Sequence, residues 1–434
     1  FNFEDVIQFG YLNLDGILNK ITDKTKIIWI CNPNNPTGTM VTEAELVEFF
    51  DKVPENVLIA YDEAYREFVT RDDYPMDSVK FTKKYPNVLI MRTFSKAYGL
   101  AGIRVAYAIG AKDIIENINK VYIVACGTAY HAGLVGKALI EKYVNIPVLA
   151  DIASEFRYNN PFVDEKTLMI VVSQSGETAD TLAALRLAKE KGARTLAVCN
   201  AVGSSISREA DDIFYTWAGP EIAVASTKAY TTQIVSLALI ALYMADKKGT
   251  IAKEEYENVL EELKLLPEKA EKVLLSKSNI MKMAQAISKK DDVFYIGRGI
   301  DYYVSMEGSL KLKEVSYIHS EAMAAGELKH GTLSLITENV PVIALATQDN
   351  VLSKMISNMK EVRARGACVI CITTPDVIIE DSLYDYKVVI PKTDATFAPF
   401  SAAVILQMIA YYTSSFRGLD VDQPRNLAKS VTVE

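Results

Sequence analysis

Histidine and cysteine are scarce in this sequence, with three histidines and five cysteines among 434 residues. An odd number of cysteines without regular spacing excludes a disulfide framework and indicates a reducing compartment, so we expect a cytoplasmic protein. Cys368 and Cys371 form a CxxC pair inside an apolar run that predicts a buried strand. With no second cysteine pair, we expect no metal site.

Basic residues are also outnumbered by acidic ones, since the formal net charge is −8. A nucleic-acid-binding surface needs a basic excess, so we expect no nucleic-acid partner. The longest apolar helical runs, 234–245 and 400–410, are shorter than a membrane span, and no signal peptide opens the chain, so no membrane partner is expected. The length predicts two to three domains.

The most informative stretch is Met169–Asp180. Ile170–Val172 predicts a buried parallel strand, and a helical pattern begins near Asp180. Between them lie hydroxyl and amide side chains and a glycine, at the point where a helix begins. Free backbone N–H groups and the helix dipole favour an anion there, so the stretch predicts a phosphate or sugar-phosphate site. The alternative is an ordinary N-cap made by Ser175 or Thr178.

Strands and helices alternate from about residue 121 onward, which predicts α/β architecture with a doubly wound parallel sheet. The pattern occurs twice, since the strand at 293–297 repeats the one at 122–127 and the strand at 340–347 repeats the one at 168–173. We therefore predict two similar domains, at 121–250 and 251–418, followed by a docked C-terminal tail at 419–434. Clefts between such units often bind small molecules.

Charged residues of chemical interest cluster in the second repeat. Lys311 and Glu314 are three residues apart, so they share one helix face. They could form a surface ion pair or take part in proton transfer. His330, in Gly326-Glu-Leu-Lys-His-Gly, could be structural or catalytic.

Residues 122–434 resemble the isomerase half of the glutamine–fructose-6-phosphate aminotransferases, which is built from two sugar-isomerase (SIS) domains. The resemblance rests on Cys126-Gly-Thr, Ser173-Gln-Ser-Gly-Glu-Thr178, Val224-Ala-Ser-Thr-Lys, Lys311-Leu-Lys-Glu314, the His330 motif and the Asp422-Gln-Pro-Arg-Asn-Leu-Ala-Lys-Ser tail. It implies fructose 6-phosphate as substrate, a homodimer, and no cofactor for this half.

The resemblance also implies roles for individual residues. Glu314 would move a proton between C1 and C2, Lys311 would assist at the C1 hydroxyl, Lys429 would form a Schiff base with the open-chain ketose, and His330 of a neighbouring subunit would help to open the sugar ring. The residues implied to hold the phosphate and line the sugar are Ser173, Gln174, Ser175, Thr178, Val224, Ser226 and Ala428.

Residues 1–120 follow a different pattern, in which three predicted strands each end in polar residues, as in ligand-binding α/β sheets. This segment resembles part of a fold-type I pyridoxal-phosphate aminotransferase of the histidinol-phosphate type. Pyridoxal phosphate is implied only if the fragment functions, with Lys96 as its attachment point. The other implied contacts are Asn35, Asp62, Tyr65, Thr93 and Arg104. A half-sheet of this kind would expose apolar surface.

The two patterns meet near Val121 without a linker, which suggests a fusion. We predict ketose–aldose isomerisation of fructose 6-phosphate. Because no glutaminase segment precedes the SIS domains here, we expect glutamine-dependent amination to be lost. Two alternatives stay open at this point, a pyridoxal-phosphate aminotransferase that uses Lys96 and a non-catalytic SIS module that only binds sugar phosphate.

Overall fold

The computed structural model describes residues 7–8, 11–93, 106–109, 118–430 and 432. The chain divides into two compact units, Phe1–Ile114 and Ile115–Glu434, and each is described by itself. Lys96 and Arg104, two of the implied cofactor contacts, lie outside the described residues.

The N-terminal unit is built on a four-stranded sheet in the order β3-β4-β5-β6. The first three strands are parallel and the fourth is antiparallel to its neighbour. The strands of this sheet are β3 (Ile27–Cys31), β4 (Leu58–Asp62), β5 (Val88–Thr93) and β6 (Ala106–Ile109). Two short strands, β1 (Ile7–Gln8) and β2 (Tyr11–Leu12), form a separate pair. The helices of the unit are α1 (Leu14–Leu18), α2 (Glu43–Lys52), η2 (Arg66–Phe68) and α3 (Lys80–Lys84). Three parallel strands therefore end at one edge, as the sequence predicts.

One face of this sheet is covered and the other is partly open. Ile28 and Ile30 of β3 are buried in a core with α2, whereas Ile27 and Trp29, which point the opposite way, are 58% and 56% exposed. Helix α2 is held in place by a capping box, in which the Thr42 hydroxyl accepts from the Glu45 N–H and the Glu45 carboxylate accepts from the Thr42 N–H. The exposed apolar side chains confirm the expectation for a partial sheet.

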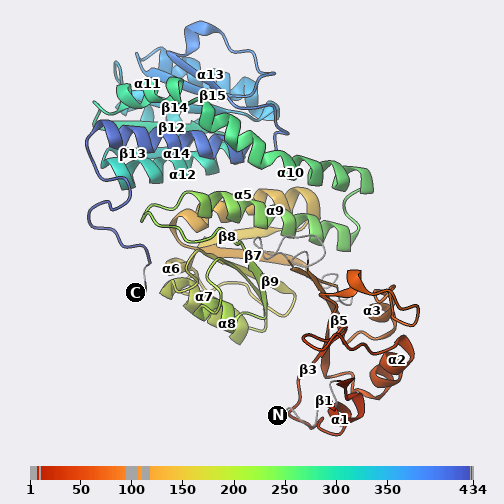
Figure 1. The fold of residues 1–434 in the computed structure, drawn as a ribbon. Coiled ribbons are helices and arrows are strands. Elements are labelled where there is room, and N and C mark those ends of the chain that lie inside the picture. The colour runs from red at the N-terminus through yellow and green to blue at the C-terminus, as the bar shows by residue number, and fades with distance from the viewer. Residues whose placement is uncertain (1–6, 9–10, 94–105, 110–117, 431, 433–434) are drawn as a thin grey trace. The chain divides into compact units, whose positions relative to one another are not determined.

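The second unit contains two five-stranded sheets with identical topology (Figure 1). In the first, the order is β11-β10-β9-β7-β8, and in the second it is β16-β15-β14-β12-β13, so each strand of one sheet has its counterpart in the other. Every pairing in both sheets is parallel. The internal repeat and the doubly wound parallel architecture are therefore confirmed.

The elements of the first of these two domains, which the motif resemblance names SIS domains, follow the predicted alternation. They are β7 (Lys120–Ala125), α5 (Gly127–Val144), β8 (Val148–Ile152), α6 (Ala153–Phe156), β9 (Thr167–Ser173), α7 (Ala179–Glu190), β10 (Arg194–Cys199), α8 (Ser205–Glu209), β11 (Asp212–Tyr215) and α9 (Lys228–Lys248). In Figure 1, α5 and α9 cover one face of the sheet and α6, α7 and α8 cover the other. All seven residues of β9 are buried, as expected for a central strand covered on both faces.

The second SIS domain repeats the arrangement. Its elements are β12 (Asp292–Gly297), α12 (Ile300–Ser316), β13 (His319–Ala324), η3 (Ala325–His330), η4 (Thr332–Leu335), β14 (Pro341–Ala346), η5 (Asp349–Val351), α13 (Leu352–Arg363), β15 (Cys368–Thr373), η6 (Asp381–Leu383), β16 (Tyr386–Val389) and α14 (Ala398–Phe416). Two further helices, α10 (Lys253–Leu275) and α11 (Lys277–Ile287), precede it and connect the two domains along the chain.

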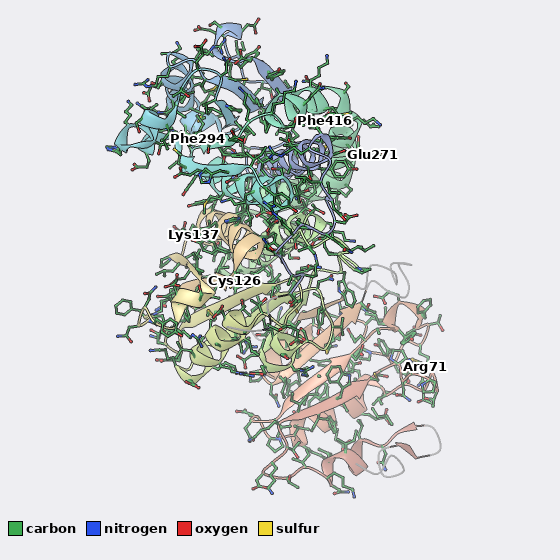
Figure 2. All side chains as sticks on the ribbon, turned by 90° about the vertical axis from the view of Figure 1, so that its left-hand side faces the viewer. Arg71, Cys126, Lys137, Glu271, Phe294 and Phe416 are labelled. Atoms are coloured by element: carbon green, nitrogen blue, oxygen red, sulfur yellow. The ribbon has the colours of Figure 1, made fainter. Side chains whose placement is uncertain are left out.

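The two SIS domains share one hydrophobic core. Helices α5 and α9 of the first domain and α12 and α14 of the second contribute buried residues to the same cluster. Figure 2 shows the side chains on the ribbon, with Cys126 marking the point where β7 ends and α5 begins. Helices from both domains are therefore packed against one another, and polar side chains on their facing surfaces can meet.

Helix α9 is longer than the apolar run 234–245 suggested, because its polar first turn continues the helix back to Lys228. By length and composition alone it could cross a membrane, but 72% of its apolar window is buried inside the structure. A core helix passes the same test, and the packing of α9 against α5 accounts for its apolar character.

Candidate active site

The loop after β9 brings its hydroxyl groups together. The Ser173 hydroxyl accepts a hydrogen bond from the Gly176 N–H at 3.0 Å and lies 3.2 Å from the Thr178 hydroxyl. The Ser175 hydroxyl accepts from the Glu177 N–H at 3.2 Å. Thr178 occupies the N-cap position of α7, yet its side chain accepts no hydrogen bond from the helix. The loop is thus more than an ordinary cap, and its hydroxyls surround the beginning of a twelve-residue helix.

Gly176 is required by the shape of this loop. Its φ is +66°, a left-handed conformation that favours glycine, and a Cβ at this position would lie 2.0 Å from the Ser204 hydroxyl oxygen. The loop therefore packs directly against the segment that precedes α8, which holds the serine-rich turn in position.

The C-terminal tail is docked on this loop, as the sequence predicts. The Ser430 hydroxyl lies 3.2 Å from the Ser175 hydroxyl, and the Lys429 ammonium donates to the Ala223 carbonyl at 2.6 Å. The Val224 N–H donates to the Asp422 carbonyl at 2.9 Å. The tail, the serine loop and the loop before α9 thus come together, and they contain all seven of the implied phosphate and sugar contacts.

The implied acid–base residues lie on α12. The Lys311 ammonium is 2.5 Å from the Glu314 carboxylate and 3.6 Å from that of Glu307. Lys311 is only 2% exposed, so the surface ion-pair interpretation is wrong for this pair. A buried lysine between two carboxylates is held in one place by charge, which suits a group that must act at a defined atom.

Sequence reasoning did not identify Glu307, His131 and Thr128, which extend this cluster. The His131 Nδ1 lies 2.8 Å from the Glu307 carboxylate, and the Thr128 hydroxyl donates to the same group at 3.1 Å. Glu307 could have been found, because it precedes Lys311 by four residues and shares its helix face. His131 and Thr128 could not, since they come from α5 of the other SIS domain.

Burial and neighbouring charges both shift the pKa values of these residues. Burial raises the pKa of Glu314 above its ordinary value, and the Lys311 charge offsets this only in part. Burial opposes the charged form of Lys311, but the two carboxylates outweigh it and raise its pKa. Desolvation lowers the pKa of Lys429, and repulsion from Lys311 adds to the effect. A lowered pKa makes a lysine a better nucleophile.

The remaining implied catalytic residue, His330, is exposed at the end of η3. Its exposure leaves the imidazole accessible to another molecule. Among the residues that the structure describes, no group of three or more histidine, cysteine, aspartate or glutamate side chains could hold a metal ion.

The implied cofactor contacts of the N-terminal unit are only partly brought together. Asn35 and Tyr65 line one pocket of about 310 Å³, together with Met40 and Phe68. The Asp62 carboxylate accepts from the Ala64 N–H at 3.0 Å and from the Cys31 thiol at 3.7 Å. Pyridoxal phosphate binding by this unit stays a prediction.

Comparison with known proteins assigns the second unit. The SIS domain model matches residues 114–243 and 286–415, which is more than half of the chain. The chain belongs to the SIS domain family. The aminotransferase class I and II model matches residues 5–145, so the two matches overlap at 114–145, where the structure contains β7 and α5 of the first SIS sheet.

Individual relatives define the family more closely. The SIS unit is similar to glutamine–fructose-6-phosphate aminotransferase (isomerizing) of Clostridium tetani, with 61% identity over 324 residues that cover 75% of this chain and 53% of the relative. The corresponding enzyme of Clostridium acetobutylicum is 58% identical over 74% of this chain and 53% of its own length. This chain thus spans about half the length of the curated relatives it matches.

A solved structure covers the same region. The C-terminal domain of glucosamine-fructose-6-phosphate aminotransferase from Francisella tularensis is similar, with a TM-score of 0.69 and 39% identity over 72% of this chain and 88% of that chain. The SIS unit therefore belongs to the C-terminal part of this enzyme family, which confirms the resemblance drawn from the motifs.

Proposed function

We propose that the SIS unit interconverts fructose 6-phosphate and glucose 6-phosphate. This would be the isomerising part of the reaction after which its relatives are named. One observation carries the proposal. The docked tail places Lys429 beside the loop before α9 and Ser430 on the serine loop, while Lys429 is close enough to Lys311 and Glu314 to feel the charge of both. The serine loop, which would bind the phosphate, thus lies against the tail that carries the Lys429 amine, and the charge of the Glu314 carboxylate acts on that amine.

The serine loop would bind the substrate phosphate. Ser173, Ser175 and Thr178 offer hydroxyl donors, and the loop ends where α7 begins, so the positive end of the helix dipole favours a dianion. Gln174 adds a side chain whose amide oxygen is buried without a hydrogen-bond partner in the described residues. The sugar would then extend past Val224, Ser226 and Ala428 toward Lys429.

Lys429 would capture the open-chain ketose. Its amine, which a lowered pKa makes available as a nucleophile, attacks the C2 carbonyl, and a water molecule leaves as the imine forms. For glucose 6-phosphate to form, water must then return to C2 and free Lys429, because an imine carried through the proton transfer would leave nitrogen on C2. Glu314 removes the proton from C1 while the C2 oxygen takes a proton from the Lys429 ammonium, which gives an enediol. Glu314 returns its proton to C2 as the C1 hydroxyl gives its proton to Lys429, and the raised pKa of Glu314 favours holding the proton between the two steps. Lys311, 2.5 Å from Glu314, would stabilise the oxygen on C1 as charge develops there.

Ring opening requires one further group, and we assign it to His330 of a second subunit. Its exposure at the end of η3 is what a residue contributed to a partner's site requires. The proposal therefore includes a homodimer. It also places the protein in the cytoplasm, because sugar phosphates are made and used there.

The test is turnover of fructose 6-phosphate to glucose 6-phosphate by the purified full chain. We expect turnover that Glu314→Gln abolishes while fructose 6-phosphate binding persists. Binding without turnover in the parent chain would favour a module that only senses sugar phosphate. Absence of both binding and turnover would overturn the proposal.

A second candidate is pyridoxal phosphate binding by the N-terminal unit, supported by the shared pocket of Asn35 and Tyr65 and by the match at residues 5–145. When bound, this cofactor acts as an electron sink for amino-acid chemistry. The test is the appearance of a yellow colour when pyridoxal phosphate is added, and its loss in Lys96→Ala. A colourless mixture would overturn it.

A further inference from the structure

Glu307 has no part in the chemistry proposed above, yet it lies at the centre of the buried polar cluster. Its carboxylate is 1% exposed and has three polar neighbours, Thr128 and His131 on α5 and Lys311 on α12. It is thus the one described carboxylate that contacts both the first SIS domain and the acid–base pair of the second.

A carboxylate is costly to bury unless charge and hydrogen bonds compensate it. The neighbours of Glu307 meet that need. Because an ionised carboxylate only accepts hydrogen bonds, the His131 Nδ1–H donates to it at 2.8 Å. Tyr230 of α9 is completely buried close by, where burial and then the Glu307 charge raise its pKa. The surroundings of Glu307 are thus closed to solvent, and its charge acts there with little screening.

Geometry links this carboxylate to the reacting groups. Lys311 lies between Glu307 at 3.6 Å and Glu314 at 2.5 Å, all within two turns of α12. An ammonium shared by two carboxylates is held less flexibly than one with a single partner, and its orientation sets the position of the Glu314 oxygen atoms.

We propose that Glu307 and His131 form a positioning pair, which joins α5 of the first SIS domain to Lys311 and thereby holds Glu314 in place for proton transfer. Neither residue contacts the substrate in this proposal. The kinetic test of this positioning role rests on the proposed isomerisation. The spectroscopic test depends only on the hydrogen bonds of the pair.

The alternative interpretation is that the pair only stabilises the packing of α5 against α12. A purely stabilising role would change the melting temperature and leave the activity per folded molecule unchanged. A positioning role lowers kcat while KM stays constant, because the interaction matters in the transition state.

The kinetic experiment compares Glu307→Gln, Glu307→Asp and Asp301→Asn in the full chain. Asp301 is the matched control, since it is also a buried carboxylate of α12 but accepts from the Thr347 N–H at 2.8 Å and contacts neither His131 nor Lys311. We expect Glu307→Gln to lower kcat about 10–100-fold, because a hydrogen-bonded charged partner of Lys311 and His131 is lost. Glu307→Asp should restore part of it, and Asp301→Asn should keep the parental kcat. Equal losses in Glu307→Gln and Asp301→Asn would overturn the proposal.

The spectroscopic experiment does not depend on turnover. The chain has only three histidines, so the imidazole ¹⁵N signal of His131 can be assigned with His131→Gln, and His319 and His330 serve as internal references. We expect Lys311→Met to shift the His131 signal in the parent chain but not in Glu307→Gln, because Glu307 carries the link. If the parent lacks turnover but shows this dependence, the proposed function fails and the pair stands. If the dependence is absent, the inference fails whatever the activity.

Discussion

The two SIS domains have the same topology but differ near the start of their first helices. The second residue of α5 is Thr128, and the second residue of α12 is Asp301. Thr128 donates its hydroxyl to Glu307, whereas Asp301 accepts from both the N–H and the hydroxyl of Thr347, at the end of β14. Thr347 occupies the place in the second domain that the serine loop has in the first.

This difference affects which domain has donor groups available for a ligand. In the second domain the donors after β14 are already used by a buried carboxylate, whose charge would also repel a phosphate. In the first domain no carboxylate accepts from the serine-loop hydroxyls in the described contacts, so they can serve a ligand. In the proposed function the first domain would therefore supply the anion site, and the second would supply the charged helix.

The largest expected effect comes from the charged helix. Glu314→Gln should lower kcat for isomerisation by about 10²–10⁴-fold, because one proton-transfer group is lost, while fructose 6-phosphate still binds at the serine loop. Glu338→Gln, at an exposed position before β14, is the matched control and should be fully active. Kinetics and calorimetry together check this, and unchanged turnover in Glu314→Gln would remove the second domain from the chemistry.

The next effect comes from the anion loop. Gly176→Ala should weaken fructose 6-phosphate binding by about tenfold or more, since the φ of +66° and the Ser204 hydroxyl both exclude a Cβ and the loop must shift. Gly249→Ala is the control, because it has a φ of +68° at the end of α9 with open space around it. It should lower the melting temperature but not the affinity. Equal affinities in the two variants would argue against a phosphate site here.

A smaller change is expected in the pH dependence. The pKa of Glu314 is raised by burial, so kcat should fall on acidification at a higher pH than an ordinary glutamate would give. Lys311 partly offsets this rise, so Lys311→Met should move the acidic limb to still higher pH. A pH–rate profile of both proteins checks the sign, and a shift to lower pH in Lys311→Met would contradict the assignment of Glu314 as the base.

The smallest effect on activity is expected at Asp301, whose pKa burial raises to about 6. Between pH 4 and 6 the folded protein then binds more protons at this group than the unfolded chain does, so its contribution to stability is present at low pH and is lost as the pH rises. Asp301→Asn should flatten this part of the stability profile. Denaturant unfolding at several pH values checks it, and an unchanged slope would show that Asp301 does not titrate there.

Local patterns determined much of this molecule. Short-range chemistry is written in neighbouring residues, so the strand and serine loop at Met169–Asp180, the helix face shared by Lys311 and Glu314, and the repeat that produced two identical sheet topologies could all be predicted. The exposed apolar residues of β3 agree with the expectation that a partial sheet exposes apolar surface, and they alternate with buried ones because a strand presents successive residues to opposite sides. The family resemblance added the roles of Lys429 and His330, which remain predictions.

Only the tertiary structure decided which distant residues meet. The pairing of His131 with Glu307 spans 176 positions and depends on two helices from different domains packing in one core. The burial of Lys311 and the contact of Ser430 with Ser175 depend on the same packing. A sequence states which side chains are available, but the surroundings that shift a pKa or fix a carboxylate are made by segments far away along the chain.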